Sequence, residues 1–217
     1  MRKTKDLPKL ENRSYLFEIR AEQSESGAII TGTPIVYERQ TDLHYFFEII
    51  ERGALDKTDL TDVRFLVNHD TSKIPLARSR RNNENSTMQL TVTFNGMDIL
   101  VNLDIENNSE ARNLYSAVSR GDITGMSFMF SVDGEEWENL ESDHPTRRIK
   151  SIASVVEVSA VTFPAYQDTS ISARDNKSAL ENARKALENV KPLENVVEKR
   201  LLELEKAKNE NRMKGGN

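Results

Sequence analysis

Short runs of apolar residues alternating with polar ones dominate positions 14–174 and predict a body built of β-strands. Turn-forming residues separate these runs at short intervals, as in a chain of hairpins. Asn95 and Gly96 lie between two runs and predict a tight hairpin turn, because both residue types accept positive φ. The expected strands are residues 15–20, 28–36, 46–50, 63–68, 88–94, 99–105, 126–132, 137–140, 148–152 and 155–162.

One segment within this body has helical spacing instead. Ala111, Leu114 and Val118 recur at intervals of three and four residues. Ser109 is a candidate N-cap of this helix, and Gly121 is a stop signal after it. Many short strands with one or two helices indicate a mainly β (α+β) fold, and we expect a closed or nearly closed β-barrel with helical insertions.

The last part of the chain, residues 175–217, has a different period. Between Ala179 and Lys208, apolar residues follow alternating three- and four-residue steps, with Glu194 at the one missing place. This pattern is typical of a coiled-coil seam, and Pro192 divides it into two helical pieces. A charged, marginally stable helical tail and a partner-binding coiled coil are equal alternatives, and both lie outside the barrel.

Composition narrows the function classes. The 217 residues contain no cysteine, which excludes a thiol nucleophile, disulfides and thiolate metal sites. The net charge of −5 argues against nucleic acid as the main partner. No apolar run approaches the roughly 20 residues of a membrane span, and the basic start lacks the apolar segment of a secretory signal. We therefore expect a soluble chain with a loose N-terminal arm (residues 1–13) before a folded domain (residues 14–174).

Candidate chemistry lies in two of the expected strands. Ser127 follows Gly125 in an apolar run, and His69 ends another run at Asn68-His69-Asp70. A histidine beside a serine converts a weak alcohol into a nucleophile. Taken singly, a strand serine is usually a satisfied hydroxyl and a lone histidine an ordinary hydrogen-bonding residue. The surrounding motifs therefore decide how these two residues are interpreted.

Four motifs occur in a distinctive order: Phe47–Ala54, Arg64–Asp70, Arg120–Phe130 and Glu157–Tyr166. Together they resemble the prohead (procapsid) maturation serine proteases of tailed bacteriophages. That family is related in fold, and in its serine–histidine centre, to the herpesvirus assembly protease. The resemblance covers about residues 14–174 and implies a herpesvirus-protease-like barrel with Ser127 as nucleophile and His69 as general base.

The third member of the catalytic group is inferred from the residues themselves. Glu157 interrupts an apolar strand, where a charge is costly unless it is paired, so it is the best candidate to orient His69. An outward-facing carboxylate is the alternative reading of Glu157. Asp70 is a weaker candidate, because neighbouring strand residues point to opposite faces. His44 and His144 are expected at the surface.

Three other features of the sequence give weaker indications of function. Phe163–Tyr166 is a candidate contributor to an oxyanion hole, which backbone N–H groups commonly build. The aspartates at positions 56, 59 and 62 lack the glycine and glutamate of a calcium loop, so we expect no metal and no cofactor. The arginines at positions 78, 80 and 81 are expected to form a solvated loop, with docking of an acidic substrate segment as a weaker alternative.

The resemblance implies a serine endopeptidase that acts inside the phage procapsid, in the cytoplasm of the bacterial host. Its expected partners are the major capsid protein precursor with its scaffold segment, and further copies of itself through autocleavage, a homodimer or the coiled-coil seam. No nucleic acid or membrane partner is expected. The alternative is a non-enzymatic scaffolding or capsid-assembly protein that retains the protease fold.

Overall fold

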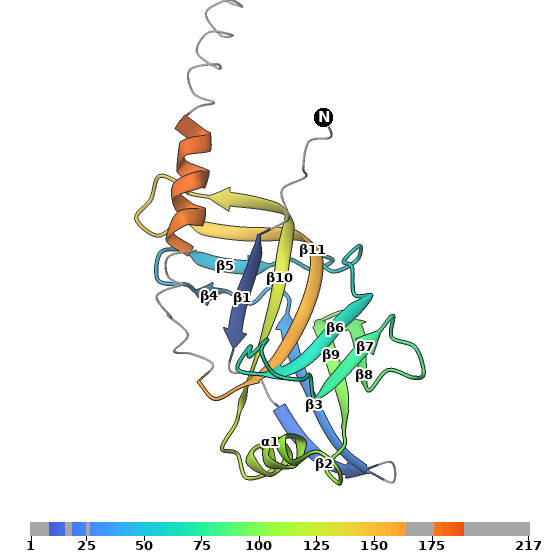
Figure 1. Ribbon diagram of the computed structural model, residues 1–217. Helices are drawn as coiled ribbons and strands as arrows, with labels where there is room; N and C mark the ends of the chain where they lie inside the picture. The colour runs from blue at the N-terminus through green and yellow to red at the C-terminus, as the bar shows by residue number, and fades with distance from the viewer. Residues whose placement is uncertain (1–8, 16–18, 25–26, 164–175, 189–217) are drawn as a thin grey trace, which may run out of the picture.

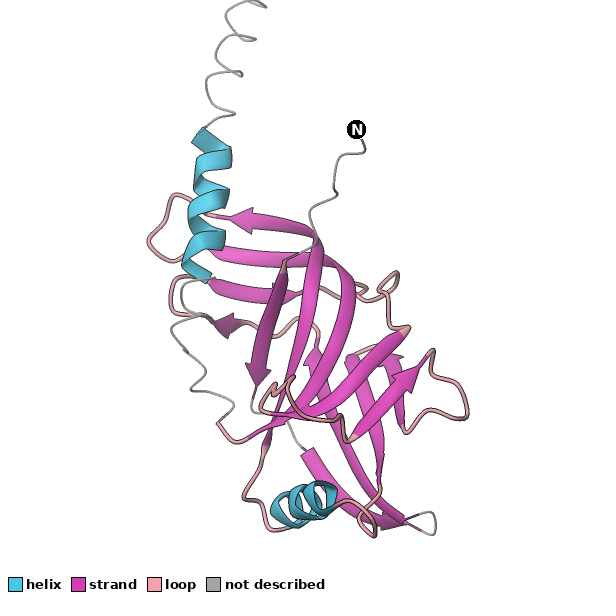
Figure 2. Cartoon of the chain, viewed as in Figure 1, coloured by secondary structure: helices cyan, strands magenta, loops and turns pink. Residues whose placement is uncertain are grey.

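The computed structural model describes residues 9–15, 19–24, 27–163 and 176–188. In these residues two β-sheets and helix α1 form the body, and a second helix spans residues 176–188 (Figures 1 and 2). The elements are β1 (Leu10–Tyr15), β2 (Ile19–Ser24), β3 (Gly27–Val36), β4 (Thr41–Asp42), β5 (Phe47–Ile50), β6 (Asp62–Val67), β7 (Ala77–Arg80), β8 (Met88–Thr93), β9 (Gly96–Leu103), α1 (Ser109–Ser119), β10 (Gly125–Glu138) and β11 (Thr146–Val161).

The larger sheet is organised around the long antiparallel hairpin of β10 and β11. On one side β1 pairs antiparallel with β10 and forms an edge of the sheet. On the other side β11 pairs in parallel with β5 along its first part and with β6 along its last part. Strands β4 and β7 complete this sheet beside β5 and β6. One long strand therefore connects the two parts of the sheet.

Irregular pairing explains the length of these two strands. The sequence predicted four short strands where β10 and β11 are continuous, so that prediction of breaks was wrong. Register shifts occur between Met129 and Phe130 and again between Ser131 and Glu135. Such irregularities bend a strand and increase its twist without ending it. The polar residues that suggested turns lie instead along the bent part of the hairpin.

The smaller sheet has the antiparallel order β2-β3-β9-β8. The predicted hairpin at Asn95-Gly96 is present, but only Gly96 of the two has positive φ, at 151°. A Cβ on Gly96 would lie 1.9 Å from the carbonyl oxygen of Ile35, which excludes any other residue there. Glycine is thus required for close approach to β3 rather than for a turn with two positive φ values.

Both sheets and α1 contribute to one hydrophobic core. Its largest fully buried side chains include Phe65, Phe128 and Phe130 of the larger sheet and Ile30 and Met97 of the smaller one. Helix α1 buries its expected apolar face, formed by the alanine, leucine and valine at positions 111, 114 and 118. Its N-cap is Asn108 rather than Ser109, because the Asn108 side chain accepts hydrogen bonds from two backbone N–H groups of the first turn.

The mainly β fold is confirmed, but the described residues contain no closed barrel. Their strand pairings form two open sheets, with edges at β1, β4 and β7 in one and at β2 and β8 in the other. The physical reason is that β11 changes partner from β5 to β6, which branches the sheet instead of closing it. No helix in the described ranges is long and apolar enough to span a membrane.

The ends of the chain differ from the sequence-based expectation where they are described. Residues 10–13, expected in a loose arm, belong to β1. The helix of residues 176–188 contacts the loop between β10 and β11: Arg184 donates to the carbonyl oxygens of Leu140 (3.1 Å) and Ser142 (2.7 Å). Leu180 is buried, with 6% of its surface exposed. The rest of the predicted coiled-coil seam, including Pro192, lies outside the described residues.

These contacts lead to a prediction about truncation. A chain ending at residue 174 loses the buried Leu180 and both Arg184 hydrogen bonds, so we expect its free energy of unfolding to fall by about 2 kcal/mol. A chain ending at residue 188 keeps these contacts and should be the more stable of the two truncated chains. Urea unfolding of the two truncated chains measures the difference. Equal stability of both would show that the helix does not stabilise the body.

Candidate active site

Strands β6, β10 and β11 bring the three predicted site residues together. Ser127 lies on β10 and Glu157 on β11, and His69 follows the end of β6 by two residues. The His69 ring is hydrogen-bonded at both nitrogens, with Nε2 2.5 Å from Ser127 Oγ and Nδ1 2.5 Å from Glu157 Oε2. The three side chains therefore form a continuous serine–histidine–carboxylate chain. This is the arrangement in which an imidazole accepts a proton from a serine while a carboxylate orients it.

Burial gives these three side chains a low-dielectric environment. Ser127 is 0% exposed and Glu157 3% exposed, and the His69 side chain is 9% exposed. A carboxylate in such a place is costly unless its oxygens are hydrogen-bonded. Here His69 takes one oxygen of Glu157 and the hydroxyl of Ser159 donates to the other. The charge that interrupts the apolar strand is thus fully paired, and the alternative of an outward-facing carboxylate is wrong.

The backbone at His69 is held in an unusual conformation. Asn68 and His69 have φ values of 52° and 56°, in the left-handed region that costs a non-glycine residue about 1–3 kcal/mol. Hydrogen bonds to β11 and the residue after it hold this turn. The N–H of Asn68 donates to the Ala160 carbonyl (2.9 Å), and the N–H of His69 donates to Ser159 Oγ (3.0 Å). Asn68 Oδ1 also accepts from the N–H of Thr162 (2.9 Å). The turn aims the imidazole back at β10.

Two residues that the sequence did not indicate also touch Ser127. The Ser127 hydroxyl donates to the backbone carbonyl of Arg13 (2.7 Å), and the hydroxyl of Ser14 donates to Ser127 Oγ (2.8 Å). Ser159 was likewise missed, although it bridges Glu157 and His69. Arg13 ends the expected loose arm, Ser14 begins the expected folded domain, and Ser159 is a serine in a strand; none of them carries a distinguishing pattern. The local sequence signal at this site was Asn68 before His69, because asparagine tolerates the positive φ of the turn that places the imidazole.

The remaining candidate residues lie away from this site. Asp70 is exposed and accepts hydrogen bonds from the hydroxyl and backbone N–H of Ser72, which lower its pKa. His44 is exposed, as expected, whereas His144 is half-buried, with Nε2 3.1 Å from Asp42 Oδ1. Within the described ranges, no group of three or more acidic or histidine side chains is arranged to hold a metal ion.

The structure describes the arginine cluster but only the first residue of the expected oxyanion segment, Phe163–Tyr166. Arg78, expected to be solvated, forms hydrogen bonds from Nε and Nη2 to the two carboxylate oxygens of Asp62, at 2.6 and 2.9 Å. Phe163 is 65% exposed. The rest of the proposed oxyanion segment, residues 164–166, lies outside the described residues.

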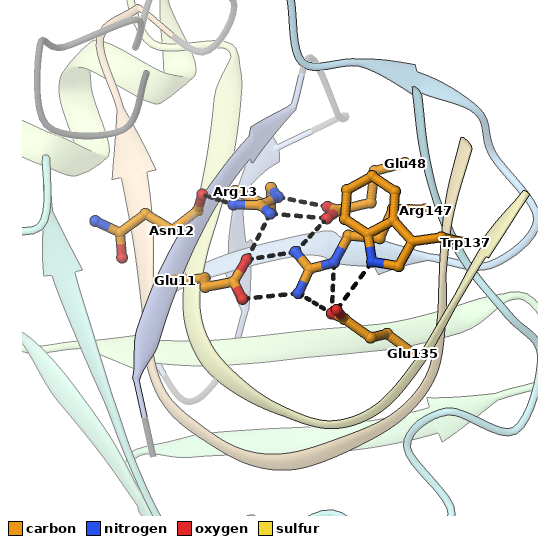
Figure 3. A network of polar contacts seen from close by, with 7 residues as sticks. All are labelled: Glu11, Asn12, Arg13, Glu48, Glu135, Trp137 and Arg147. Atoms are coloured by element: carbon orange, nitrogen blue, oxygen red, sulfur yellow. Dashed lines mark hydrogen bonds and ion pairs between the residues drawn. The ribbon is translucent and has the colours of Figure 1, made fainter. Parts of the chain in front are cut away.

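A network of charged side chains links β1 to neighbouring strands (Figure 3), and Arg13, Glu48 and Arg147 in it are buried. Arg13 binds Glu48 through two hydrogen bonds, and Arg147 links Glu48 to Glu11 and Glu135. Burial by itself raises the pKa of Glu11, but hydrogen bonds and charge from Arg147 and Arg13 outweigh it and lower this pKa to about 2. The network joins β1 to β5, β10 and β11, and through Arg13 it reaches the residue whose carbonyl contacts Ser127.

The lowered pKa predicts an acid-sensitive contribution to stability. The pKa of Glu11 is about 2 in the folded chain and about 4.5 when unfolded, so its stabilising effect is complete above pH 4.5 and is lost as the pH falls towards 2. The full loss, reached only near pH 2, should be on the order of 3 kcal/mol, of which about 2 kcal/mol is lost by pH 3. Urea unfolding at pH 6, 4 and 3 of the wild type and Glu11→Gln measures it. An equally steep loss in Glu11→Gln would place the acid-sensitive groups elsewhere.

Fold and site together define a mainly β protein with a hydrogen-bonded serine–histidine–carboxylate arrangement. Residues 16–185 match the family of caudovirus prohead serine proteases, and the chain belongs to this family. Among solved structures, the chain is similar to the bacteriophage T4 capsid assembly protease, gp21, with 11% identity and a TM-score of 0.42 over 72% of this chain and 99% of that one. No curated protein matches the sequence.

Proposed function

We propose that this chain is a serine endopeptidase of phage head maturation, with Ser127 as nucleophile, His69 as general base and Glu157 as the residue that orients His69. The observation that carries this proposal is the unbroken hydrogen-bonded chain from Ser127 Oγ through both nitrogens of His69 to Glu157. Membership of the prohead serine protease family supplies the reaction class.

The geometry supports a specific sequence of steps. His69 Nε2 accepts the hydroxyl proton as Ser127 Oγ attacks a peptide carbonyl, and the proton then passes to the leaving amine. A water molecule repeats the sequence and releases the acyl group from Ser127. Throughout, Glu157 accepts from Nδ1–H, which keeps Nε2 available as the base and stabilises the positive charge that develops on the ring.

The proposed substrates are inferred from the family rather than from the geometry of the site. We propose that the chain cleaves the scaffold segment of the major capsid protein precursor, and itself, inside the procapsid within the host cell. A non-enzymatic assembly protein is the second candidate, and the intact Ser127–His69–Glu157 chain argues against it, because an inactive relative has no need of three aligned and buried polar side chains.

The test is direct. The purified full chain is incubated with its capsid precursor, and the products are identified by mass spectrometry. Cleavage of the precursor or of the chain itself supports the proposal. An intact precursor and an intact chain, under conditions where the two associate, would favour the assembly role.

A further inference from the structure

The strand that covers Ser127 is β1, at the edge of the larger sheet. In the β1–β10 pairing Ser14 lies directly opposite Ser127. The carbonyl oxygen of the preceding residue, Arg13, is 2.7 Å from Ser127 Oγ and accepts its hydroxyl proton. A main-chain carbonyl of the protein's own β1 therefore contacts Ser127 Oγ directly.

This contact is incompatible with attack. A serine hydroxyl has one proton, and in the catalytic step that proton must pass to His69 Nε2. While Ser127 donates to the Arg13 carbonyl, it cannot donate to His69. Ser127 is also 0% exposed, so a carbonyl from outside has no access to Oγ. For the site to act on another chain, the segment that covers Ser127 has to move.

Its position at the edge makes β1 the element that can be exchanged. β10 pairs with β11 on one side and with β1 on the other, so removal of β1 exposes one row of β10 backbone groups. An extended peptide can add to such an edge through main-chain hydrogen bonds, with side-chain pockets providing specificity. β1 itself demonstrates that an extended segment fits beside Ser127.

The buried charges indicate what the replacing segment must carry. Arg13 donates to both oxygens of Glu48, which is 1% exposed and is otherwise bound by Arg147. Departure of β1 removes Arg13 from Glu48 and Glu11 from Arg147. Buried charges that lose their partners are strongly destabilising, so the position of Arg13 requires another cation.

We propose that β1 occupies the substrate position, and that an extended substrate segment displaces it, pairs with the edge of β10 and places a basic side chain opposite Glu48. This inference rests on the proposed protease function and specifies its substrates: the segment that binds beside Ser127 carries a basic residue. It also makes the resting chain self-inhibited, because Ser127 stays bonded to Arg13 until a segment with matching charge replaces β1.

A reversible cross-link tests the displacement. The chain has no cysteine, so Asn12→Cys with Met129→Cys introduces one directly opposed pair between β1 and β10. We expect the oxidised variant to keep its unfolding temperature and to lose at least tenfold in peptide turnover, with recovery on reduction. Gln89→Cys with Leu100→Cys, an opposed pair on β8 and β9, is the matched control and should be active in both states.

These experiments distinguish a failure of this inference from a failure of the proposed protease function. Full turnover by the oxidised Asn12–Met129 pair would overturn the substrate position of β1 and leave the protease function intact. A wild-type chain that is inactive on capsid precursor and on peptides would overturn the protease function and this inference with it.

A pair of peptides tests the charge requirement. One contains the β1 sequence Leu-Glu-Asn-Arg-Ser-Tyr, and the other has glutamine in place of arginine. We expect the arginine peptide to inhibit turnover of a peptide substrate with a Ki at least tenfold lower than that of the glutamine peptide, because its arginine replaces Arg13 opposite Glu48. Equal inhibition by the two peptides would overturn the proposed role of Glu48 in recognition.

Discussion

Ser127→Ala is expected to abolish proteolysis while leaving the body folded. The substitution removes the nucleophilic oxygen, and loss of such a group costs roughly 10⁴–10⁶-fold in kcat where the hydroxyl is part of a catalytic chain. Its volume change is small, and the lost hydrogen bonds to Arg13 and Ser14 should change stability by only about 1 kcal/mol. Cleavage of capsid precursor, followed by mass spectrometry, measures the loss.

His69→Ala should be nearly as inactive, because a serine attacks slowly without a base. The double variant should lose little more than either single one, since the two residues act as a unit. Ser131→Ala is the matched control: Ser131 is also on β10 and 0% exposed, and its hydroxyl lies 2.9 Å from that of Ser154. Processing by Ser127→Ala at the rate of Ser131→Ala would remove Ser127 from the mechanism.

Glu157→Gln is expected to reduce kcat by roughly 10²–10⁴-fold, less than loss of Ser127. The carboxylate accepts two hydrogen bonds on different oxygens, from His69 and from Ser159. An amide has only one oxygen, so its NH₂ group must face one of these two partners. If it faces His69, Nδ1 becomes the acceptor and the ring proton moves to Nε2, which then cannot accept from Ser127. The inactive tautomer is thus favoured without a change in side-chain size.

The measurement is the pH dependence of peptide cleavage together with thermal unfolding. Asp70→Asn is the control, because this neighbouring carboxylate is exposed and bonded to Ser72, and we expect wild-type activity from it. If Glu157→Gln kept full activity at neutral pH, Glu157 would have no part in orienting His69. A large loss in Asp70→Asn would instead assign that role to Asp70.

Much of the fold was predictable because it depends on local patterns. Alternation of apolar and polar residues predicted the strand-rich body, and helical spacing predicted α1 with its buried face. The errors occurred where local signals were ambiguous. Polar residues inside β10 and β11 resembled turns, whereas the structure accommodates them at register shifts in continuous strands. A branched, open sheet cannot be distinguished from a barrel by the period of its strands, since both have a period of two.

The sequence by itself determined the residues at the centre of the candidate site: the resemblance indicated Ser127 and His69, and the cost of a charge in an apolar strand indicated Glu157. Only the tertiary structure revealed that Arg13 and Ser14 cover the nucleophile and that Ser159 bridges Glu157 and His69. Ser14 and Ser127 are 113 positions apart, and neither strand contains a sequence pattern that indicates pairing with the other. Periodicity and capping signals report on neighbours along the chain, whereas strand pairing brings together residues whose proximity depends on the register of the whole sheet.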